Sequence, residues 1–395
     1  MPMWIQPGQA DDSITIHTGY GRSGIGRVAD VTSNSSQLFD KAMSSGGIDV
    51  YPLMYSTNPL FAPSSISLTN NSYPIACVQD HHSLEGRDMY RQATLQEYKK
   101  NPNYATFKSV HKYEVPGIKE ANELGEDQPI SLFNELMVVP GEPQWGMTID
   151  LNSCFGCGVC IVACQSENNI PVIGKREVAR GREMHWIRND RYYLGDLENP
   201  QAVHQPVACV HCELAPCEQV CPVAATTHSD DGMNQMTYNR CIGTRYCANN
   251  CPFKVRRFNF FNYPKEYLTT GEDPDIIQMA MNPNVTVRFR GVMEKCTYCV
   301  QRVNEAKIQA KIETGSAKPA DGTVKSACQS ACPANCITFG DLTDPNSKVS
   351  EMKRNERNYL LLEELNVRPR TSYIAKLTNP NPALVTKETN EEYAH

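Results

Sequence analysis

Cysteine is the residue type in this chain most able to do chemistry, because its thiols are crowded into four short groups. Fifteen of the 17 cysteines lie between Cys154 and Cys332, and long cysteine-poor stretches flank them. Thiols two or three residues apart cannot easily pair as disulfides, but all of them can bind one soft metal centre. The spacing therefore predicts metal binding rather than a disulfide scaffold.

The first two groups have the spacing of iron–sulfur ligands. "CFGCGVCIVAC" and "CVHCELAPCEQVCP" each place three closely spaced cysteines before a fourth. They supply Cys154, Cys157, Cys160, Cys164, Cys209, Cys212, Cys217 and Cys221. In ferredoxin-type loops the first three thiolates bind one [4Fe-4S] cluster, and the fourth, usually before proline, reaches the second cluster of a pair.

The third and fourth groups repeat this pattern with one exception. In "CIGTRYCANNCP" the second cysteine is replaced by Thr244, and the fourth group is split into "CTYC" and "CQSACP". These groups supply Cys241, Cys247, Cys251, Cys296, Cys299, Cys328 and Cys332. Four groups predict two ferredoxin-like halves, each with two clusters, in an α+β fold.

The ligand count suggests what the third group binds. Fifteen cysteines make three full sets and one set of three. A [3Fe-4S] cluster lacks one iron and suits three thiolates, so we expect three [4Fe-4S] clusters and one [3Fe-4S] cluster. Alternatives are an oxygen ligand from Thr244 or water that holds a fourth iron, or an empty site. Structural zinc is a further rival, but its knuckles are usually a dozen or more residues apart.

Other features limit the function. The net charge of −6 argues against nucleic acid, and no apolar stretch approaches the length of a membrane span. Residues 1–12 lack the basic and apolar regions of a signal peptide, which alone would indicate the cytoplasm. We interpret Cys336 as a buried spectator and Cys77 as a structural or free thiol.

Basic and aromatic residues follow the third group in "KVRRFNFF". Lys254, Arg256 and Arg257 either stabilise anionic clusters or an anionic partner surface, or they form an ordinary solvated edge. The histidines, His211 among them, show no pairing typical of zinc or haem, and we interpret them as surface residues or neighbours of the ligands. We recognise no catalytic set of nucleophile, base and orienting residue.

Three longer stretches resemble a known family. "CIGTRYCANNCPFKVRRFNFFNY", "RGVMEKCTYCVQRVNEAK" and "RNYLLLEELNVRPRTSYIAKLTNPNP" are similar to the iron–sulfur part of the large periplasmic subunit of bacterial alternative complex III. That complex oxidises quinol and is related to polysulfide and dimethyl sulfoxide reductases. The resemblance covers about residues 141–380 and includes the threonine of the third group.

The resemblance implies how the ligands are shared. In the family, the first group shares clusters with the fourth, and the second with the third. The implied [4Fe-4S] sets are Cys154, Cys157, Cys160 and Cys332; Cys296, Cys299, Cys328 and Cys164; and Cys209, Cys212, Cys217 and Cys251. The implied [3Fe-4S] set is Cys241, Cys247 and Cys221, with Thr244 at the vacant ligand position.

The resemblance also suggests the domain order. Residues 1–70 resemble the β-rich end of a molybdopterin-oxidoreductase-like domain that carries no molybdenum, and the alternation in "SITIHTGY" predicts a strand over residues 13–20. Residues 71–140 are expected to be a linker with a short helix within residues 86–100. A four-cluster domain at 141–345 opens with a strand before Cys154. A helical and extended tail follows at 346–395, with one helix predicted over residues 350–365. Because so short an N-terminal piece cannot form its own core, we favour a fragment of a longer subunit over a missing separate chain.

Four clusters in a row predict an electron carrier rather than an enzyme. By resemblance, electrons pass from a quinol-binding integral-membrane subunit toward c-type cytochromes, on the periplasmic face of the inner membrane. The chain itself is then peripheral and reaches the membrane only through partners. The alternative is the electron-transfer subunit of a molybdenum-containing reductase. A zinc scaffold without redox chemistry is a third hypothesis.

Overall fold

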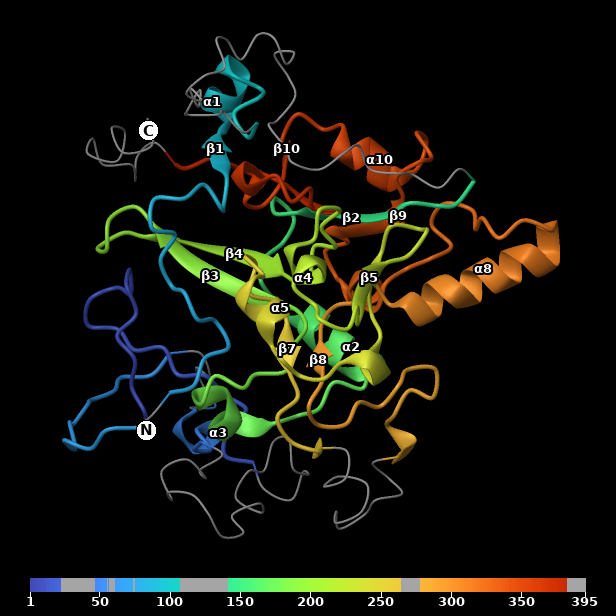
Figure 1. Cartoon of the computed structure of the whole chain (residues 1–395). Coiled ribbons are helices and arrows are strands. Elements are labelled where there is room, and N and C mark those ends of the chain that lie inside the picture. Colours follow the sequence, from blue (N-terminus) through green and yellow to red (C-terminus); the bar gives the residue numbers. More distant parts are fainter. Residues whose placement is uncertain are drawn as a thin grey trace, which may run out of the picture. The chain divides into compact units, whose positions relative to one another are not determined.

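A computed structural model describes residues 1–22, 47–54, 56, 61–73, 75–106, 141–263 and 278–381 (Figure 1). The chain forms two compact units, and all four cysteine groups belong to the larger one. The smaller unit consists of residues 1–80, 172–183 and 193–201, and the larger of residues 81–171, 184–192 and 202–395. Among the described residues, no helix has both the length and the apolar character needed to cross a bilayer.

The smaller unit has little regular structure in its described part. Its elements are the 3-10 helix η2 (Tyr51–Leu53) and helix α3 (Gly174–Ala179). The strand predicted over residues 13–20 is wrong, and the described residues of 1–70 contain no strand. Ile14 and Ile16 are 45% and 38% exposed. An alternating pattern is not stable as a strand without a hydrogen-bonded neighbour, and no strand in the described part of the chain pairs with this segment.

A four-stranded sheet organises the larger unit. Its order is β10 (Asn358–Tyr359), β11 (Thr371–Ile374), β2 (Trp145–Asp150) and β9 (Ile337–Asp341). β11 is parallel to β2, and the other two pairs are antiparallel. The strand predicted before Cys154 is confirmed as β2. Because β11 pairs directly with β2, residues of the expected tail form part of the sheet that carries the first cysteine loop.

Aromatic side chains pack on one face of this sheet. The Trp145 ring stacks on Phe339 with centroids 5.3 Å apart, and Tyr298 meets the same ring edge-on at 5.2 Å. The buried Tyr373 hydroxyl donates to the Pro206 carbonyl at 2.8 Å. Such side chains bury large apolar areas, so the sheet forms a rigid base for the loops at its edge.

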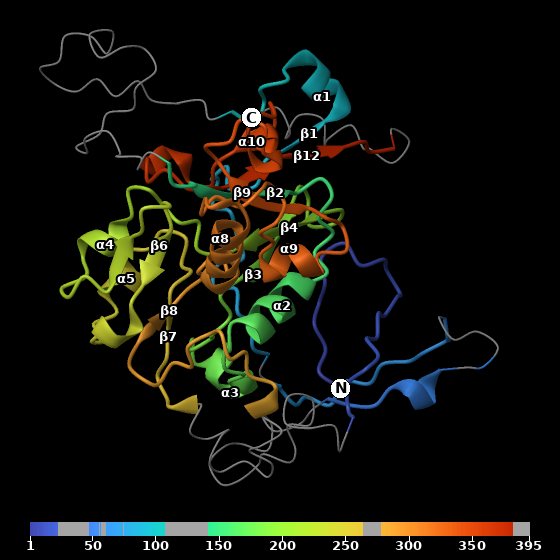
Figure 2. The same ribbon diagram turned by 90° about the vertical axis from the view of Figure 1, so that its right-hand side faces the viewer.

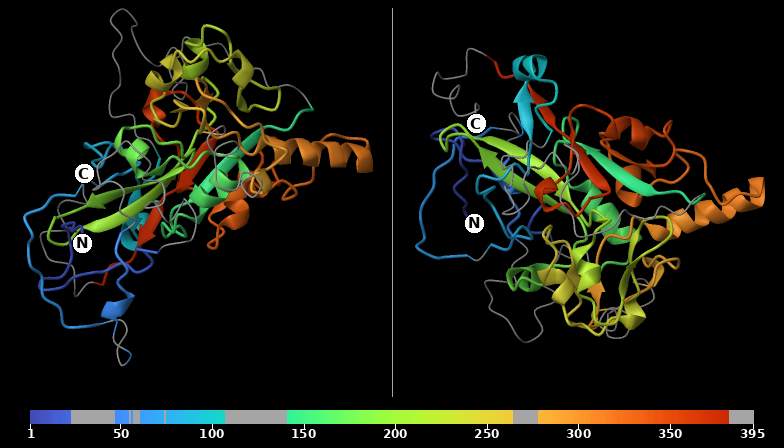
Figure 3. Two further views of the ribbon diagram at one scale, coloured as in Figure 1. Left: turned by 90° about the horizontal axis from the view of Figure 1, so that it is seen from below. Right: turned by 45° about the horizontal axis from the view of Figure 1, so that its top comes forward.

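Helices surround the first and fourth cysteine groups. They are α2 (Val159–Glu167), α8 (Val300–Thr314), α9 (Ala327–Ala331) and α10 (Lys348–Lys353). α2 packs against α9, and α10 packs on β9 (Figure 2). α8 ends at Gly315, which has a left-handed φ of 77°, and projects away from the sheet (Figure 3).

The second and third groups lie among much smaller elements. These are α4 (Pro216–Gln219), α5 (Tyr246–Asn249), β5 (Thr226–His228), β6 (Asn234–Met236), β7 (Arg257–Phe258), β8 (Met293–Glu294) and η4 (Tyr238–Arg240). β5 pairs with β6, and β7 with β8. The longer strands β3 (Arg188–Leu194) and β4 (Gln201–Val207) form a separate pair.

Strand β1 (Gln92–Thr94) pairs in parallel with β12 (Lys376–Thr378), so the expected linker contacts the C-terminal segment. The helix predicted within residues 86–100 is present only as α1 (Leu95–Lys100), and the capping box of Thr94 and Glu97 fixes its start. The long helix predicted from Ser350 is shorter: α10 ends at Lys353, and β10 and η5 (Glu363–Leu365) follow.

Candidate iron–sulfur sites

All four cysteine loops share one backbone turn. The residue two positions after the first cysteine has a left-handed φ in each: 75° at Gly156, 49° at His211, 75° at Gly243 and 55° at Tyr298. This conformation is uncommon outside glycine, so its fourfold occurrence marks a repeated structural requirement. The turn folds each loop back on itself, which allows thiols from neighbouring positions to face one centre.

Four predicted ligands line a cavity of about 370 Å³, here called cavity A. They are Cys154, Cys157, Cys160 and Cys332. Cys154 lies shortly after β2, which ends at Asp150, and its amide donates to the Asp150 carbonyl at 3.1 Å. Cys332 caps the C-terminal end of α9. The sheet and one helix thus bring together cysteines that are far apart in the sequence.

The second predicted set also gathers around one point. Cys164 is buried on α2, and the Asn168 amide lies 3.6 Å from its sulfur and 4.0 Å from that of Cys299. The Ala327 amide donates to the Cys299 sulfur at 3.3 Å. Burial raises the pKa of Cys164, and the negative charges of Cys296, Cys299 and Cys328 raise it further. The structure therefore places all four thiols within electrostatic reach of each other.

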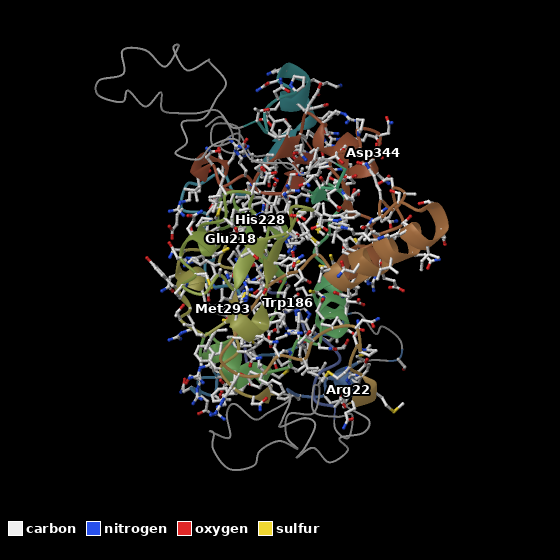
Figure 4. All side chains as sticks on the ribbon, turned by 45° about the vertical axis from the view of Figure 1, so that its right-hand side comes forward. Arg22, Trp186, Glu218, His228, Met293 and Asp344 are labelled. Atoms are coloured by element: carbon white, nitrogen blue, oxygen red, sulfur yellow. The ribbon has the colours of Figure 1, made fainter. Side chains whose placement is uncertain are left out.

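The third set lines cavity B, with a volume of about 320 Å³. Its cysteines are Cys209, Cys212, Cys217 and Cys251. The Asn234 amide lies 3.8 Å from the Cys217 sulfur and also donates to Glu218. Figure 4 labels Glu218 beside His228, whose Nδ1 is 2.7 Å from the carboxylate. These hydrogen bonds hold α4, which follows the second cysteine loop, against β5 and β6.

The third group forms part of cavity C, with a volume of about 290 Å³. Cys221, Cys241 and Cys247 line it together with Thr244, and Met293, labelled in Figure 4, lies on its wall. The turns match those of the first group: φ is 76° at Gly158 and 61° at Arg245, one residue after Cys157 and Thr244 respectively. Thr244 therefore occupies the backbone position that holds a thiol in cavity A.

The chemistry of these thiols fits iron–sulfur clusters. Burial raises the pKa of Cys160 and of Cys217 to about 11 each. A thiol in such surroundings stays protonated at neutral pH unless a cation replaces its proton, which is what iron does. Among the described residues, no three metal-binding side chains converge closely enough for a single ion. The sulfurs instead surround cavities, as a larger centre requires.

Two cysteines lie outside the predicted sets. Cys336 is buried, lines cavity A, and has its sulfur 3.3 Å from that of Cys332. A hydrogen bond with Cys336 also lowers the pKa of Cys154 to about 6. Cys336 is therefore a fifth thiol at this site, although its spacing from the other cysteines did not indicate this. Cys77 is an exposed free thiol in the smaller unit.

His211 and Tyr298 form a contact that reasoning from the sequence missed. Their rings stack with centroids 3.7 Å apart, and both side chains are fully buried. His211 accepts a hydrogen bond from the Asn234 amide, and the Tyr298 hydroxyl bonds Thr371. Each lies two positions after the first cysteine of its loop, His211 in the second loop and Tyr298 in the fourth. This equivalence is the one feature of the sequence that could have suggested their contact. The stack is a buried contact between the second and fourth cysteine loops.

The residues after the third group are not a uniform solvated edge. Arg256 and Arg257 are each 6% exposed, whereas Lys254 is exposed. Arg256 lies on the wall of cavity B. A second buried cation, Lys295, precedes Cys296 and was not singled out in the sequence. Both positive charges therefore lie in the interior beside candidate ligands.

Comparison with known proteins supports the same chemistry. Two family models, each described as a 4Fe-4S dicluster domain, match residues 147–225 and 201–264. Together they cover the first three cysteine groups. A [4Fe-4S] dicluster domain is thus present within residues 147–264, which supply all of the lining of cavity B and part of the lining of cavities A and C.

Several curated proteins are similar over most of their own length. The iron–sulfur cluster-binding subunit of menaquinone reductase from Nitratidesulfovibrio vulgaris is 35% identical over 255 residues, which are 62% of this chain and 92% of the relative. A putative iron–sulfur subunit of dimethyl sulfoxide reductase from Halobacterium salinarum is 33% identical, covering 63% and 85%. An Hdr-like menaquinol oxidoreductase iron–sulfur subunit from Archaeoglobus fulgidus is 33% identical, covering 59% and 84%.

Proposed function

Since the chain belongs to the family of iron–sulfur subunits of multi-subunit oxidoreductases, we propose that it carries electrons between a membrane partner that binds quinone and a second redox partner. The gathering of 15 cysteines into four sets, three of them around cavities, carries this proposal. In this role the chain is not a catalyst by itself. The names of its relatives favour a complex of the molybdenum-reductase type.

Each set has a proposed cofactor. Three [4Fe-4S] clusters would be held by Cys154, Cys157, Cys160 and Cys332; by Cys296, Cys299, Cys328 and Cys164; and by Cys209, Cys212, Cys217 and Cys251. A [3Fe-4S] cluster would be held by Cys221, Cys241 and Cys247. Such clusters supply one-electron chemistry, with potentials set by cluster type, charge and hydrogen bonds to sulfur.

The protein groups around these sets have definite tasks. Amides of Ala225 and Ala327 donate to the sulfurs of Cys221 and Cys299 at 3.2 and 3.3 Å. Hydrogen bonds of this kind stabilise negative charge on sulfur and raise the potential of a bound cluster. The stacked rings of His211 and Tyr298 keep water out of the space between the second and third sets.

A second candidate is the corresponding part of alternative complex III. The observation that favours it is Thr244, which lies at a ligand position in cavity C. The resemblance to alternative complex III includes this threonine. In this case quinol electrons would enter at the [3Fe-4S] cluster and leave toward c-type cytochromes, on the periplasmic face of the membrane. Purification of the native complex separates the two candidates: a molybdopterin-binding chain supports the first, and covalently bound haem supports the second.

The cofactor assignment is tested by low-temperature EPR with iron and sulfide counts on the anaerobically purified full chain. We expect about 15 irons per chain and a signal near g of about 2.01 in the oxidised protein that disappears on reduction. Zinc in place of iron would overturn the electron-transfer proposal. About 16 irons without that signal would instead retain the electron-transfer role and remove the [3Fe-4S] cluster.

Thr244→Cys is the sharpest variant for cavity C. Because Thr244 has the backbone position of a ligand, the new thiol should allow a fourth iron, raising the count by about one and abolishing the signal near g of about 2.01. Thr244→Ser is the matched control and should leave both unchanged. An unaltered iron count and spectrum in Thr244→Cys would contradict the assignment of this position.

A further inference from the structure

Two buried cations lie between the candidate cluster sites without a carboxylate partner. Arg256 is 6% exposed and Lys295 is fully buried. Two other buried arginines are neutralised by carboxylates. Arg188 lies 3.0 Å from Asp190, and Arg288 lies 2.8 Å from Glu294, which also accepts a bond from Trp186 (labelled in Figure 4). Within the described part of the chain, neither Arg256 nor Lys295 has such an ion pair.

Arg256 is directed at two of the cavities. Its Nη2 donates to the Thr226 hydroxyl at 2.8 Å and lies 3.3 Å from the Met236 sulfur, and both partners line cavity C. The side chain itself lines cavity B. Its Nε and Nη1 are buried and have no hydrogen-bond partner in the protein. Two donors are therefore left for an acceptor that the polypeptide does not supply.

Lys295 does not line cavity B but contacts one of the residues that do. Its ammonium group donates to the carbonyl of Asn234, a residue that lines cavity B, and to the carbonyl of Cys296 at 2.9 Å. Its charge acts on the Cys217 thiol. Lys295 thus lies between the ligand set of cavity B and the set that contains Cys296. Arg256 lies between the ligand sets of cavities B and C.

Electrostatics identifies the missing partner. A cation removed from water is strongly destabilising unless an anion is close by. Burial lowers the pKa of Arg256, but the negative charge on Cys217, Cys247 and other nearby thiolates outweighs it and raises the pKa above its usual value. A cluster bound by four thiolates would bring a net negative charge to cavity B. No lysine or arginine is found among the described residues that line cavity A, although the charge of Lys376 acts on the Cys154 thiol there.

We propose that Arg256 and Lys295 are the internal counter-ions of the cluster in cavity B and raise its reduction potential above that of the cluster in cavity A. This inference rests on the proposed function, because it requires a cluster in each cavity. Reduction transfers one electron from the reductant to the cluster and makes it more negative by one charge. A fixed cation nearby therefore favours the reduced state.

The test is an EPR-monitored redox titration of the full chain with dithionite, comparing wild type, Arg256→Met and Arg256→Lys. We expect Arg256→Met to lower the midpoint potential of one [4Fe-4S] cluster by at least about 59 mV. For a one-electron couple, this shift changes the ratio of oxidised to reduced cluster tenfold at a given potential. Arg256→Lys keeps the charge and should shift it much less. Cys217→Ser identifies which signal belongs to cavity B.

Each outcome decides the inference. Loaded clusters whose potentials are the same in Arg256→Met and wild type overturn the counter-ion role and leave the proposed function intact. Wild-type protein without iron overturns the proposed function itself. If Arg256→Met loses the iron of cavity B, retention of that iron in Arg256→Lys supports a need for positive charge. Equal loss in both variants overturns it, because side-chain shape would then be the requirement.

Discussion

The two ferredoxin-like halves hold similar cysteine loops, but the secondary structure around these loops differs greatly between them. In the first half, formed by the first and fourth cysteine groups, the loops join strands β2 and β9 of the central sheet and helices α2, α8 and α9. In the second half, formed by the second and third groups, the cysteines lie on loops and on helices α4 and α5 of four residues each. The same loop motif thus occurs both beside the four-stranded sheet and among much smaller elements.

The difference indicates where each half gets its stability. The first half buries large aromatic side chains such as Trp145 and Phe339 in its sheet. The second half has two-stranded pairs of two or three residues, which are not stable alone in water. We infer that bound clusters act as the missing core of the second half, as structural metals do in small domains.

Iron removal should give the largest contrast between the halves. After chelation, we expect amide hydrogen exchange in residues 209–251 to accelerate by at least about 100-fold, because the thiols there lose the centre that holds them together. Amides of β2, β9 and β11 should stay protected by the sheet. Mass-spectrometric exchange measures both regions in one sample. Equal acceleration in both halves would refute the proposed difference in support.

Substitution of a single ligand should have the next largest effect, and the iron lost should differ between cavities A and C. Cys241→Ala leaves two thiols in cavity C, so we expect loss of about three irons per chain. Cys332→Ala should retain about four irons in cavity A, because the Cys336 sulfur lies 3.3 Å from that of Cys332 and can replace it. The double variant Cys332→Ala/Cys336→Ala is the control. If Cys332→Ala alone loses as much iron as the double variant, Cys336 is only a spectator.

The smallest expected effect concerns an ion pair within the first half. Arg302 on α8 contacts both Glu167 oxygens at 2.9 and 2.7 Å, and its hydrogen bond lowers the pKa of Glu167. Both side chains are partly exposed, so Arg302→Gln should cost about 1 kcal/mol. Faster hydrogen exchange in α8, with no change in residues 209–251, is the expected readout.

The sign of the pH dependence follows from the lowered pKa of Glu167. Its contribution to stability is present above the pKa of an unfolded glutamate and is lost as the pH falls through the folded value. Exchange in α8 should therefore differ between wild type and Arg302→Gln at neutral pH and converge at acidic pH. A difference that persists unchanged in acid would contradict an electrostatic origin.

Local patterns in the sequence predicted local features well. The cysteine spacing correctly indicated 4Fe-4S dicluster domains, and the strand predicted in "QWGMTIDLNSC" before the first cysteine loop is confirmed as β2. The ligand sets remain predictions, although the structure brings their cysteines together. Local alternation misled at residues 13–20, where no partner strand is present among the described residues. The helix expected beyond Lys353 fails because the Asn355 side chain accepts the Arg357 amide and forms a turn instead.

Features that depend on distant segments could not be predicted. β11 joins β2 although the two strands lie near opposite ends of the larger unit's sequence, and no local pattern encodes such a pairing. The stack of His211 on Tyr298 and the isolation of Lys295 from carboxylates depend in the same way on tertiary contacts. Composition could identify Arg256 as basic, but only the fold shows that it faces cavity B.

The parallel pairing of β1 with β12 has a mechanical consequence. Gln92 pairs with Lys376 and Thr94 with Thr378, so the two strands run in the same direction. Tension applied at the start of β1 and the end of β12 would pull the strands along each other rather than peel them apart. All pairs of this short ladder would then bear the load at once. Because the cluster-binding loops lie between β1 and β12 in the sequence, force along the chain would be borne by this strand pair before it reached them.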